Sequence, residues 1–95
     1  MKQIVGVVGL GLIGGSIAKA FISAGWKVLA YDSNLSITSY AIISGTVDAE
    51  LTANSLKQCD VIHIAITPNA ANEYLQLNAA HNDTDSLPIF KYLLL

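Results

Sequence analysis

Three glycines near the start of the chain constrain its fold more than any other feature. Gly9, Gly11 and Gly14 follow an apolar run at residues 4–8 and precede a second apolar stretch at residues 12–24. The first run is short and rich in valine, as is typical of a buried strand in a parallel sheet. The second has apolar residues at three- and four-residue spacing, which predicts a helix. The chain is therefore expected to begin with a strand, a tight turn and a helix.

Each glycine of this turn has a physical purpose. Gly9 lets the chain turn sharply off the strand, Gly11 lets the backbone lie against a pyrophosphate, and Gly14 lets the helix pack close to the strand. Leu12 and Ile13 open the helix, whose free N–H groups and positive dipole end favour a phosphate. We therefore predict that these five residues bind a dinucleotide. The alternative is a turn whose glycines serve packing only.

A carboxylate closes the second predicted strand, at residues 27–32. Asp32 lies 18 residues after Gly14. This is close to the spacing of about 20 residues at which an acidic residue binds the adenosine ribose. A carboxylate there repels a 2′-phosphate, and no Lys or Arg between Ser33 and Gly45 receives one. The sequence therefore favours NAD over NADP, with Asp32 and Ser33 at the ribose. A solvated carboxylate at a strand end or helix cap is the alternative.

The rest of the chain alternates predicted helices and strands. Helices are expected at residues 33–44, 53–59 and 69–80, and strands at 46–48 (at the sheet edge) and 61–66, while 87–95 is either a final strand or an apolar tail. This alternation, with 53% hydrophobic residues, predicts an α/β, Rossmann-like fold with a mostly parallel sheet and helices on both faces. The length of 95 residues allows one domain, residues 1–95.

The spacing of apolar residues also predicts which helix faces are buried. The stripe expected on the first helix is Ile13, Ile17, Ala20, Phe21 and Ala24, and the face expected on the second is Ile37, Tyr40, Ala41 and Ser44.

The amino-acid sequence of the glycine turn resembles that of one protein family. Gly-Leu-Gly-Leu-Ile-Gly-Gly-Ser at residues 9–16, with Tyr31-Asp32 later, is similar to the start of the prephenate and arogenate dehydrogenases of tyrosine biosynthesis. They belong to the wider 6-phosphogluconate dehydrogenase-like group, and the resemblance covers about residues 4–75. It implies that the strand at 61–66 lies beside the first strand. Thr67 and Pro68, after that strand, would then contact the ribose and nicotinamide side of the cofactor.

The resemblance does not extend to the family's catalytic half. Those enzymes oxidise prephenate or arogenate with loss of carbon dioxide and pass a hydride to NAD(P), which calls for a polarising histidine and for cations on the substrate carboxylates. The sequence has no arginine and none of the family's later motifs. The resemblance thus implies a truncated, N-terminal cofactor-binding portion, incomplete and not catalytic alone, without the catalytic and dimerisation domain. It does not separate prephenate from arogenate.

Two other hypotheses about the function stay open. One is a non-catalytic nucleotide-binding or protein-interaction module, for which the apolar end Leu93–Leu95 would meet a partner chain or a second copy of this chain. The other is a remnant that folds poorly, because a domain this small buries a limited core.

Few residues offer other chemistry. His63 lies within an apolar strand, where a satisfied buried or half-buried histidine is commoner than a catalytic one. Cys59 is the single cysteine and cannot form an internal disulfide, which fits a reducing cytoplasm. The histidines and this cysteine match no metal pattern. A net charge of −2 argues against nucleic acid, and the lack of a run of about 18 apolar residues argues against a membrane span.

Overall fold

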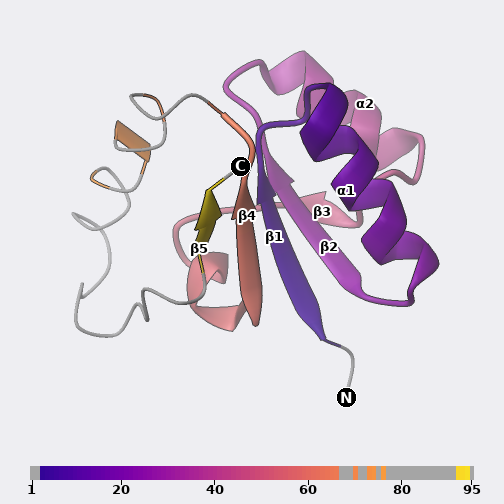
Figure 1. The fold of residues 1–95 in the computed structure, drawn as a ribbon. Helices are drawn as coiled ribbons and strands as arrows, with labels where there is room; N and C mark the ends of the chain where they lie inside the picture. Colours follow the sequence, from indigo (N-terminus) through magenta and orange to yellow (C-terminus); the bar gives the residue numbers. More distant parts are fainter. Residues whose placement is uncertain (1–2, 67–69, 71–72, 75, 77–91, 95) are drawn as a thin grey trace.

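A single sheet organises the chain in the computed structural model, which describes residues 3–66, 70, 73, 74, 76 and 92–94 (Figure 1). In chain order the elements are β1 (Ile4–Val8), α1 (Leu12–Ser23), β2 (Lys27–Tyr31), α2 (Leu35–Ile43), β3 (Ala49–Glu50), the 3-10 helix η1 (Ser55–Gln58), β4 (Val61–Ile64) and β5 (Tyr92–Leu94).

The sheet has the order β3-β2-β1-β4-β5, and every pairing among the described strands is parallel. The chain moves outward from β1 through β2 to β3 and then crosses back to β4 on the other side of β1. Strand order therefore reverses between β1 and β4, and ligands of open parallel sheets bind at the carboxyl ends of such strands. The Rossmann-like fold and the pairing of β4 with β1 are as predicted.

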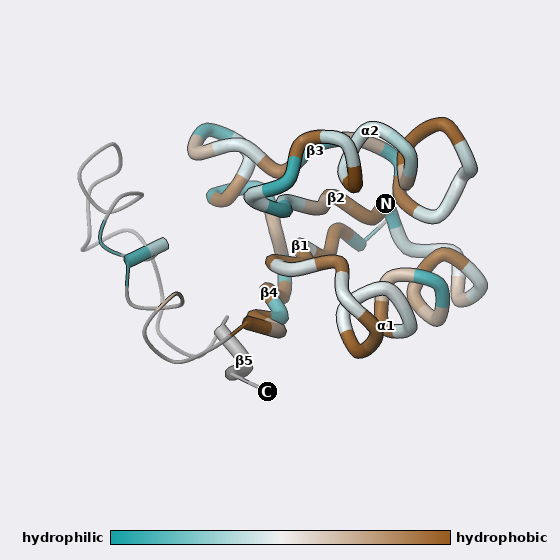
Figure 2. Tube along the Cα trace, turned by 90° about the horizontal axis from the view of Figure 1, so that it is seen from above, coloured by the Kyte–Doolittle hydropathy of each residue, from teal (hydrophilic) through white to brown (hydrophobic). Residues whose placement is uncertain are grey.

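The two long helices cover one face of the sheet. Ala18 of α1 and Ala41 of α2 pack with Val5 and Val7 of β1 in one buried cluster, and Figure 2 shows both helices on the same side of the strands. The opposite face is covered by the segment around η1 and by Tyr74. Helical structure on both faces leaves the central strands buried on each side, which explains their nearly continuous apolar sequence.

The buried face of α1 differs from the predicted stripe. Ile17 and Phe21 do pack against the core, but Ile13 is 61% exposed and Ala20 and Ala24 are exposed too. Instead, two small residues, Gly14 and Ala18, are fully buried against the strands. The helix lies so close to the sheet that only small side chains fit between them.

The predicted face of α2 is wrong for three of its four residues. Ala41 is buried as expected, but Ile37, Tyr40 and Ser44 are exposed, and Thr38 is buried in their place. Thr38 faces inward because its Oγ1 accepts a hydrogen bond from the backbone N–H of Asp32, at 3.2 Å.

The third strand is Ala49–Glu50, so none of the predicted residues 46–48 belongs to it. Asp48 explains the shift, because its carboxylate accepts the backbone N–H of Val28 at 2.8 Å while its own N–H donates to the Val28 carbonyl. That carboxylate takes the place of a backbone acceptor, so the ladder with β2 starts one residue further on. Asp60 holds the backbone of Ile4 in the same way at the start of β1.

The predicted helix at 53–59 is the shorter η1, and β4 ends at Ile64 rather than residue 66. Of the predicted helix at 69–80, residues 70, 73, 74 and 76 are described, and all four are helical. For segment 87–95, the described part is β5, which pairs with β4. No helix within the described ranges is long and apolar enough to cross a membrane.

Candidate functional site

The turn after β1 requires glycine at two positions. Gly9 has a φ of +95°, and a Cβ there would lie 2.5 Å from Ile66 Cγ2 and 2.8 Å from the carbonyl oxygen of Ala65. A Cβ on Gly14 would overlap the carbonyl oxygen of Gly9. The Gly9 conflict arises because the turn passes against the residues that follow β4, and the Gly14 conflict arises because α1 starts directly against the turn. Glycines at these positions let the helix begin at the sheet edge.

The start of α1 is open to a ligand. Gly11 is its N-cap and provides no side-chain hydrogen bond, whereas Asn34 caps α2 by accepting the N–H of Ser36 at 3.1 Å. The N–H groups in the first turn of a helix have no partner within the helix. A Cβ on Gly11 would meet nothing within 4 Å, and Leu12 is 90% exposed. The turn therefore offers uncapped donors on a freely accessible backbone, which suits a phosphate.

Asp32 ties the end of β2 to the glycine turn. Its Oδ2 accepts the backbone N–H of Leu10 at 2.9 Å, and its Oδ1 accepts the backbone N–H of Asn34, also at 2.9 Å. An ionised carboxylate has about four acceptor positions, so these two bonds fix its orientation and leave acceptors for a ligand. The side chain is half-buried and stands beside the turn.

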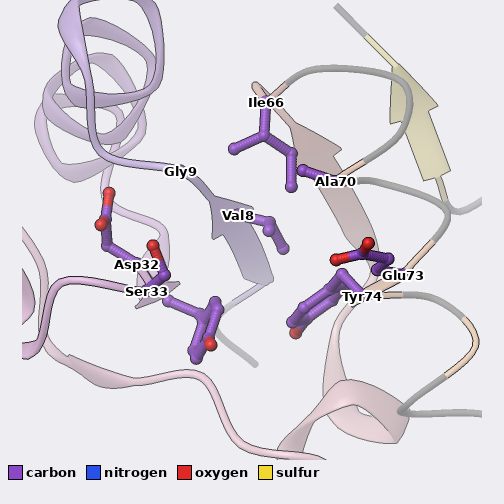
Figure 3. A pocket seen from close by; sticks show the side chains of 9 residues that line it. Val8, Gly9, Asp32, Ser33, Ile66, Ala70, Glu73 and Tyr74 are labelled. Carbon is purple, nitrogen blue, oxygen red and sulfur yellow. The ribbon is translucent and has the colours of Figure 1, made fainter.

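A cavity of about 290 Å³ opens at the carboxyl ends of the central strands. Figure 3 shows Gly9, Asp32 and Ser33 on one side of it and Glu73 and Tyr74 on the other. Its lining residues are Val8, Gly9, Tyr31, Asp32, Ser33, Ile66, Ala70, Glu73 and Tyr74. The cavity thus has mainly apolar walls with two carboxylates, the composition typical of a small-molecule site.

The structure brings some of the predicted site residues together. Gly9, Asp32 and Ser33 line this cavity. Gly11 and Leu12 lie on the other side of the turn, at a second cavity of about 260 Å³ between α1 and α2. Gly14 is buried and Ile13 is exposed next to the turn, and neither lines a cavity. Thr67 and Pro68 lie outside the described residues.

Two lining residues were missed from the sequence as site residues. Tyr74 and Glu73 belong to the helix expected at residues 69–80, but neither was predicted to bind a ligand. The signal was their place in a helix that follows β4, because such a helix starts at the same sheet edge as the glycine turn. Tyr74 is only 8% exposed, and its ring centroid lies 5.2 Å from that of Tyr31.

His63 and Cys59 lie away from this cavity. His63 is half-buried as predicted, but its Nδ1 is buried without a hydrogen-bond partner among the described residues, so it is not the fully satisfied histidine expected. Burial lowers its pKa. Cys59 is buried, and its Sγ donates to the carbonyl oxygen of Ser55 at 3.5 Å. Within the part of the chain that the structure describes, no three metal-binding side chains come together.

Solved structures of similar fold are dehydrogenases by name. Arogenate dehydrogenase from Synechocystis matches with a TM-score of 0.74 and 25% identity, over 83% of this chain and 29% of that one. Prephenate dehydrogenase from A. aeolicus, in complex with hydroxyphenyl propionate and NAD+, matches with a TM-score of 0.64 and 24% identity, over 85% and 30%. The chain thus spans less than a third of the length of either enzyme.

A third structure is similar in fold at a lower sequence identity. It is 3-hydroxyisobutyrate dehydrogenase from Mycobacterium tuberculosis, with a TM-score of 0.70 and 16% identity over 99% of this chain and 31% of that one. A comparison with curated proteins gives no match.

One family profile covers most of the chain. The NAD binding domain of 6-phosphogluconate dehydrogenase matches residues 4–85, which include the glycine turn, Asp32 and the whole cavity. The resemblance to dehydrogenase cofactor domains seen in the sequence is thereby confirmed, and a dinucleotide is the cofactor that such a domain binds. The chain belongs to the family of NAD-binding domains named after 6-phosphogluconate dehydrogenase.

Proposed function

We propose that the chain binds NAD at the carboxyl ends of β1, β2 and β4 and is the cofactor-binding portion of an oxidoreductase. One observation carries this proposal: the uncapped start of α1 and the carboxylate of Asp32 flank the same turn, and Asp32 and Gly9 of that turn line the cavity. A dinucleotide needs a donor-rich turn for its pyrophosphate and, beside that turn, an acceptor for the hydroxyls of its ribose. When bound, NAD would accept the hydride that the oxidised substrate gives up.

Each part of the turn has a role in this arrangement. The first-turn N–H groups of α1 at Leu12 and Ile13 hold the pyrophosphate, and Gly11 leaves room for its approach. Asp32 accepts hydrogen bonds from the ribose hydroxyls, with its orientation already fixed by Leu10 and Asn34. Ser33, Thr67 and Pro68 complete the contacts that we expect.

NAD is preferred to NADP in this proposal. The residues that line the cavity include Asp32 and Glu73 but no lysine, and the sequence has no arginine. A 2′-phosphate would therefore meet negative charge without a compensating cation. The absence of guanidinium groups also removes the strongest partner for a phosphate.

The oxidoreductase is proposed to act on prephenate or arogenate, in tyrosine biosynthesis. Support comes from the sequence of the glycine turn and from the two dehydrogenases of similar fold. We assign cofactor binding to residues 1–95 and no catalytic residue, so that the chain does not turn over either compound alone. A cytoplasmic location fits the single, buried cysteine.

The experiment is isothermal titration of the chain with NAD and, separately, with NADP. Wild type is expected to bind NAD more tightly than NADP. Asp32→Asn is expected to weaken NAD binding about tenfold or more, since it removes a charge-assisted acceptor. Glu50→Gln is the matched control, because it removes one negative charge at an exposed position outside the cavity. Absence of NAD binding by a chain that is folded by circular dichroism would refute the proposal.

The second candidate is a protein-interaction module. Large apolar side chains lie exposed on α2 and at the start of α1, with Tyr40 72%, Ile43 84% and Leu12 90% exposed. Such a surface, or the apolar C-terminal segment, would meet a partner chain or a second copy of this one. Light scattering tests this candidate, and a monodisperse monomer that does not bind a hydrophobic dye would count against it.

A further inference from the structure

We infer that Glu73 makes the cavity selective for adenine, by accepting a hydrogen bond from the 6-amino group of the base. The inference rests on the proposed binding of NAD and names the residue that recognises its adenine. It is carried by the position of Glu73 in the cavity, by the apolar walls beside it and by the chemistry of a carboxylate.

The order of phosphate, ribose and base along NAD determines where the base lies in the cavity. The phosphates belong at the glycine turn and the ribose at Asp32, so the base must extend away from the turn, past Asp32. Figure 3 shows what lies in that direction: Glu73 and Tyr74 stand across the cavity from Asp32 and Ser33. The base therefore enters the part of the cavity that these two residues close.

The walls there suit a flat ring. Val8, Ile66, Ala70 and Tyr74 contribute apolar surface to the cavity, against which an aromatic base can pack. Tyr74 is held in place, since its side chain is almost fully buried and its ring contacts Tyr31.

Glu73 adds polarity to this apolar end. Glu73 immediately precedes Tyr74 in the helical segment. Because Tyr74 is buried, it fixes the backbone from which the Glu73 side chain reaches the rim of the cavity. With Asp32 engaged by the ribose, Glu73 is the remaining carboxylate among the lining residues. An ionised carboxylate only accepts hydrogen bonds.

This property discriminates between bases. Adenine presents an amino group at position 6, which donates to a carboxylate. Hypoxanthine has a carbonyl oxygen at the same position, and a carboxylate repels it. A site built for a donor rejects an analogue that replaces the donor by an acceptor.

The test compares NAD with its deamino analogue, in which hypoxanthine replaces adenine, by titration of the full chain. Wild type is expected to bind NAD about five- to tenfold more tightly than the analogue, the size of one charge-assisted hydrogen bond at an exposed carboxylate. Glu73→Gln is expected to bring this ratio close to one, because an amide can either accept or donate. Glu50→Gln carries the same charge change away from the cavity and is expected to keep the wild-type ratio.

The outcomes separate the inference from the proposed function. Equal binding of NAD and the analogue by wild type would overturn the role of Glu73 while leaving NAD binding intact. The same would follow if Glu73→Gln and Glu50→Gln changed the ratio equally. No binding of either dinucleotide by the folded chain would overturn the proposed function, and the inference with it.

Discussion

At the scale of single residues, alanine substitutions at two adjacent glycines of α1 are predicted to have opposite effects on stability. A Cβ on Gly14 would overlap the Gly9 carbonyl oxygen, whereas a Cβ on Gly15 has Leu10 O as its nearest neighbour, at 3.8 Å. Gly14→Ala is therefore expected to destabilise the fold by about 1–3 kcal/mol, since the backbone must shift. Gly15→Ala is expected to stabilise it by up to about 1 kcal/mol, through helix propensity. Urea unfolding followed by circular dichroism measures both, and a Gly14→Ala variant as stable as Gly15→Ala would contradict the packing argument.

The burial of His63 predicts how the stability of the fold changes as the pH falls. Burial lowers its pKa from the ordinary value of 6.5, so the folded chain binds this proton less tightly than the unfolded chain. Its contribution to stability is present above pH 6.5 and is lost as the pH falls through 6.5 toward the lower, folded value. The urea midpoint of wild type is thus expected to fall between pH 7.5 and 5.5 by more than that of His63→Gln.

His81→Gln is the matched control for this pH series, because it removes the other histidine of the chain and leaves His63 in place. It is expected to keep the wild-type loss of stability. If His63→Gln lost as much stability as wild type over the same range, protonation of His63 would not be the cause.

The sequence predicts residues whose chemistry depends on local spacing. Gly9 and Asp32 could be singled out because a fixed number of residues links a strand, a turn and the next strand, and the structure places both beside one cavity. Spacing alone did not single out Glu73, since it reaches that cavity through the crossover that brings β4 beside β1. Spacing along the chain carries no information about which distant segment closes a site.

At the scale of elements, the helix faces show where apolar periodicity fails. The sequence of α2 places apolar residues all round the helix, with Leu35, Tyr40 and Ile43 exposed, so spacing alone cannot select the side that meets the sheet. In α1 the close approach at Gly14 selects small residues for the fully buried part of the interface, while Ile13 is exposed and Ile17 and Phe21 are only partly buried against the core. The central strands β1, β2 and β4 were predicted better than the edge strand β3, because burial on both faces makes the whole strand apolar.

The N-cap of α2 gives a prediction at this scale. Asn34 Oδ1 accepts the N–H of Ser36 at 3.1 Å, and no acidic residue supports the first turn of this helix. Asn34→Ala is expected to cost about 1 kcal/mol of stability in urea unfolding. Ser39→Ala, at an exposed position in the same helix, is expected to be neutral or slightly stabilising. Equal effects of the two variants would show that the cap contributes nothing.

At the scale of the whole molecule, three separate segments meet at the cavity. The end of β1 with its turn, the end of β2 with Asp32, and the helical residues around Tyr74 are far apart in the sequence and are joined only through the sheet. A chain of 95 residues buries a limited core, so we expect its stability to be marginal. A ligand that bridges these segments therefore contributes a large share of the total stability.

Binding of NAD is accordingly expected to stabilise the whole fold. At a concentration of 100 times Kd, a ligand that binds only the folded state adds about 2.7 kcal/mol. In a domain of this size that raises Tm by about 10 °C or more. NADP at the same concentration is expected to produce a smaller rise because Asp32 and Glu73 oppose its 2′-phosphate. Thermal unfolding followed by circular dichroism measures both shifts, with Asp32→Asn expected to lose most of the NAD shift and Glu50→Gln to retain it. A larger shift with NADP than with NAD would show that the carboxylates at the cavity do not select the cofactor.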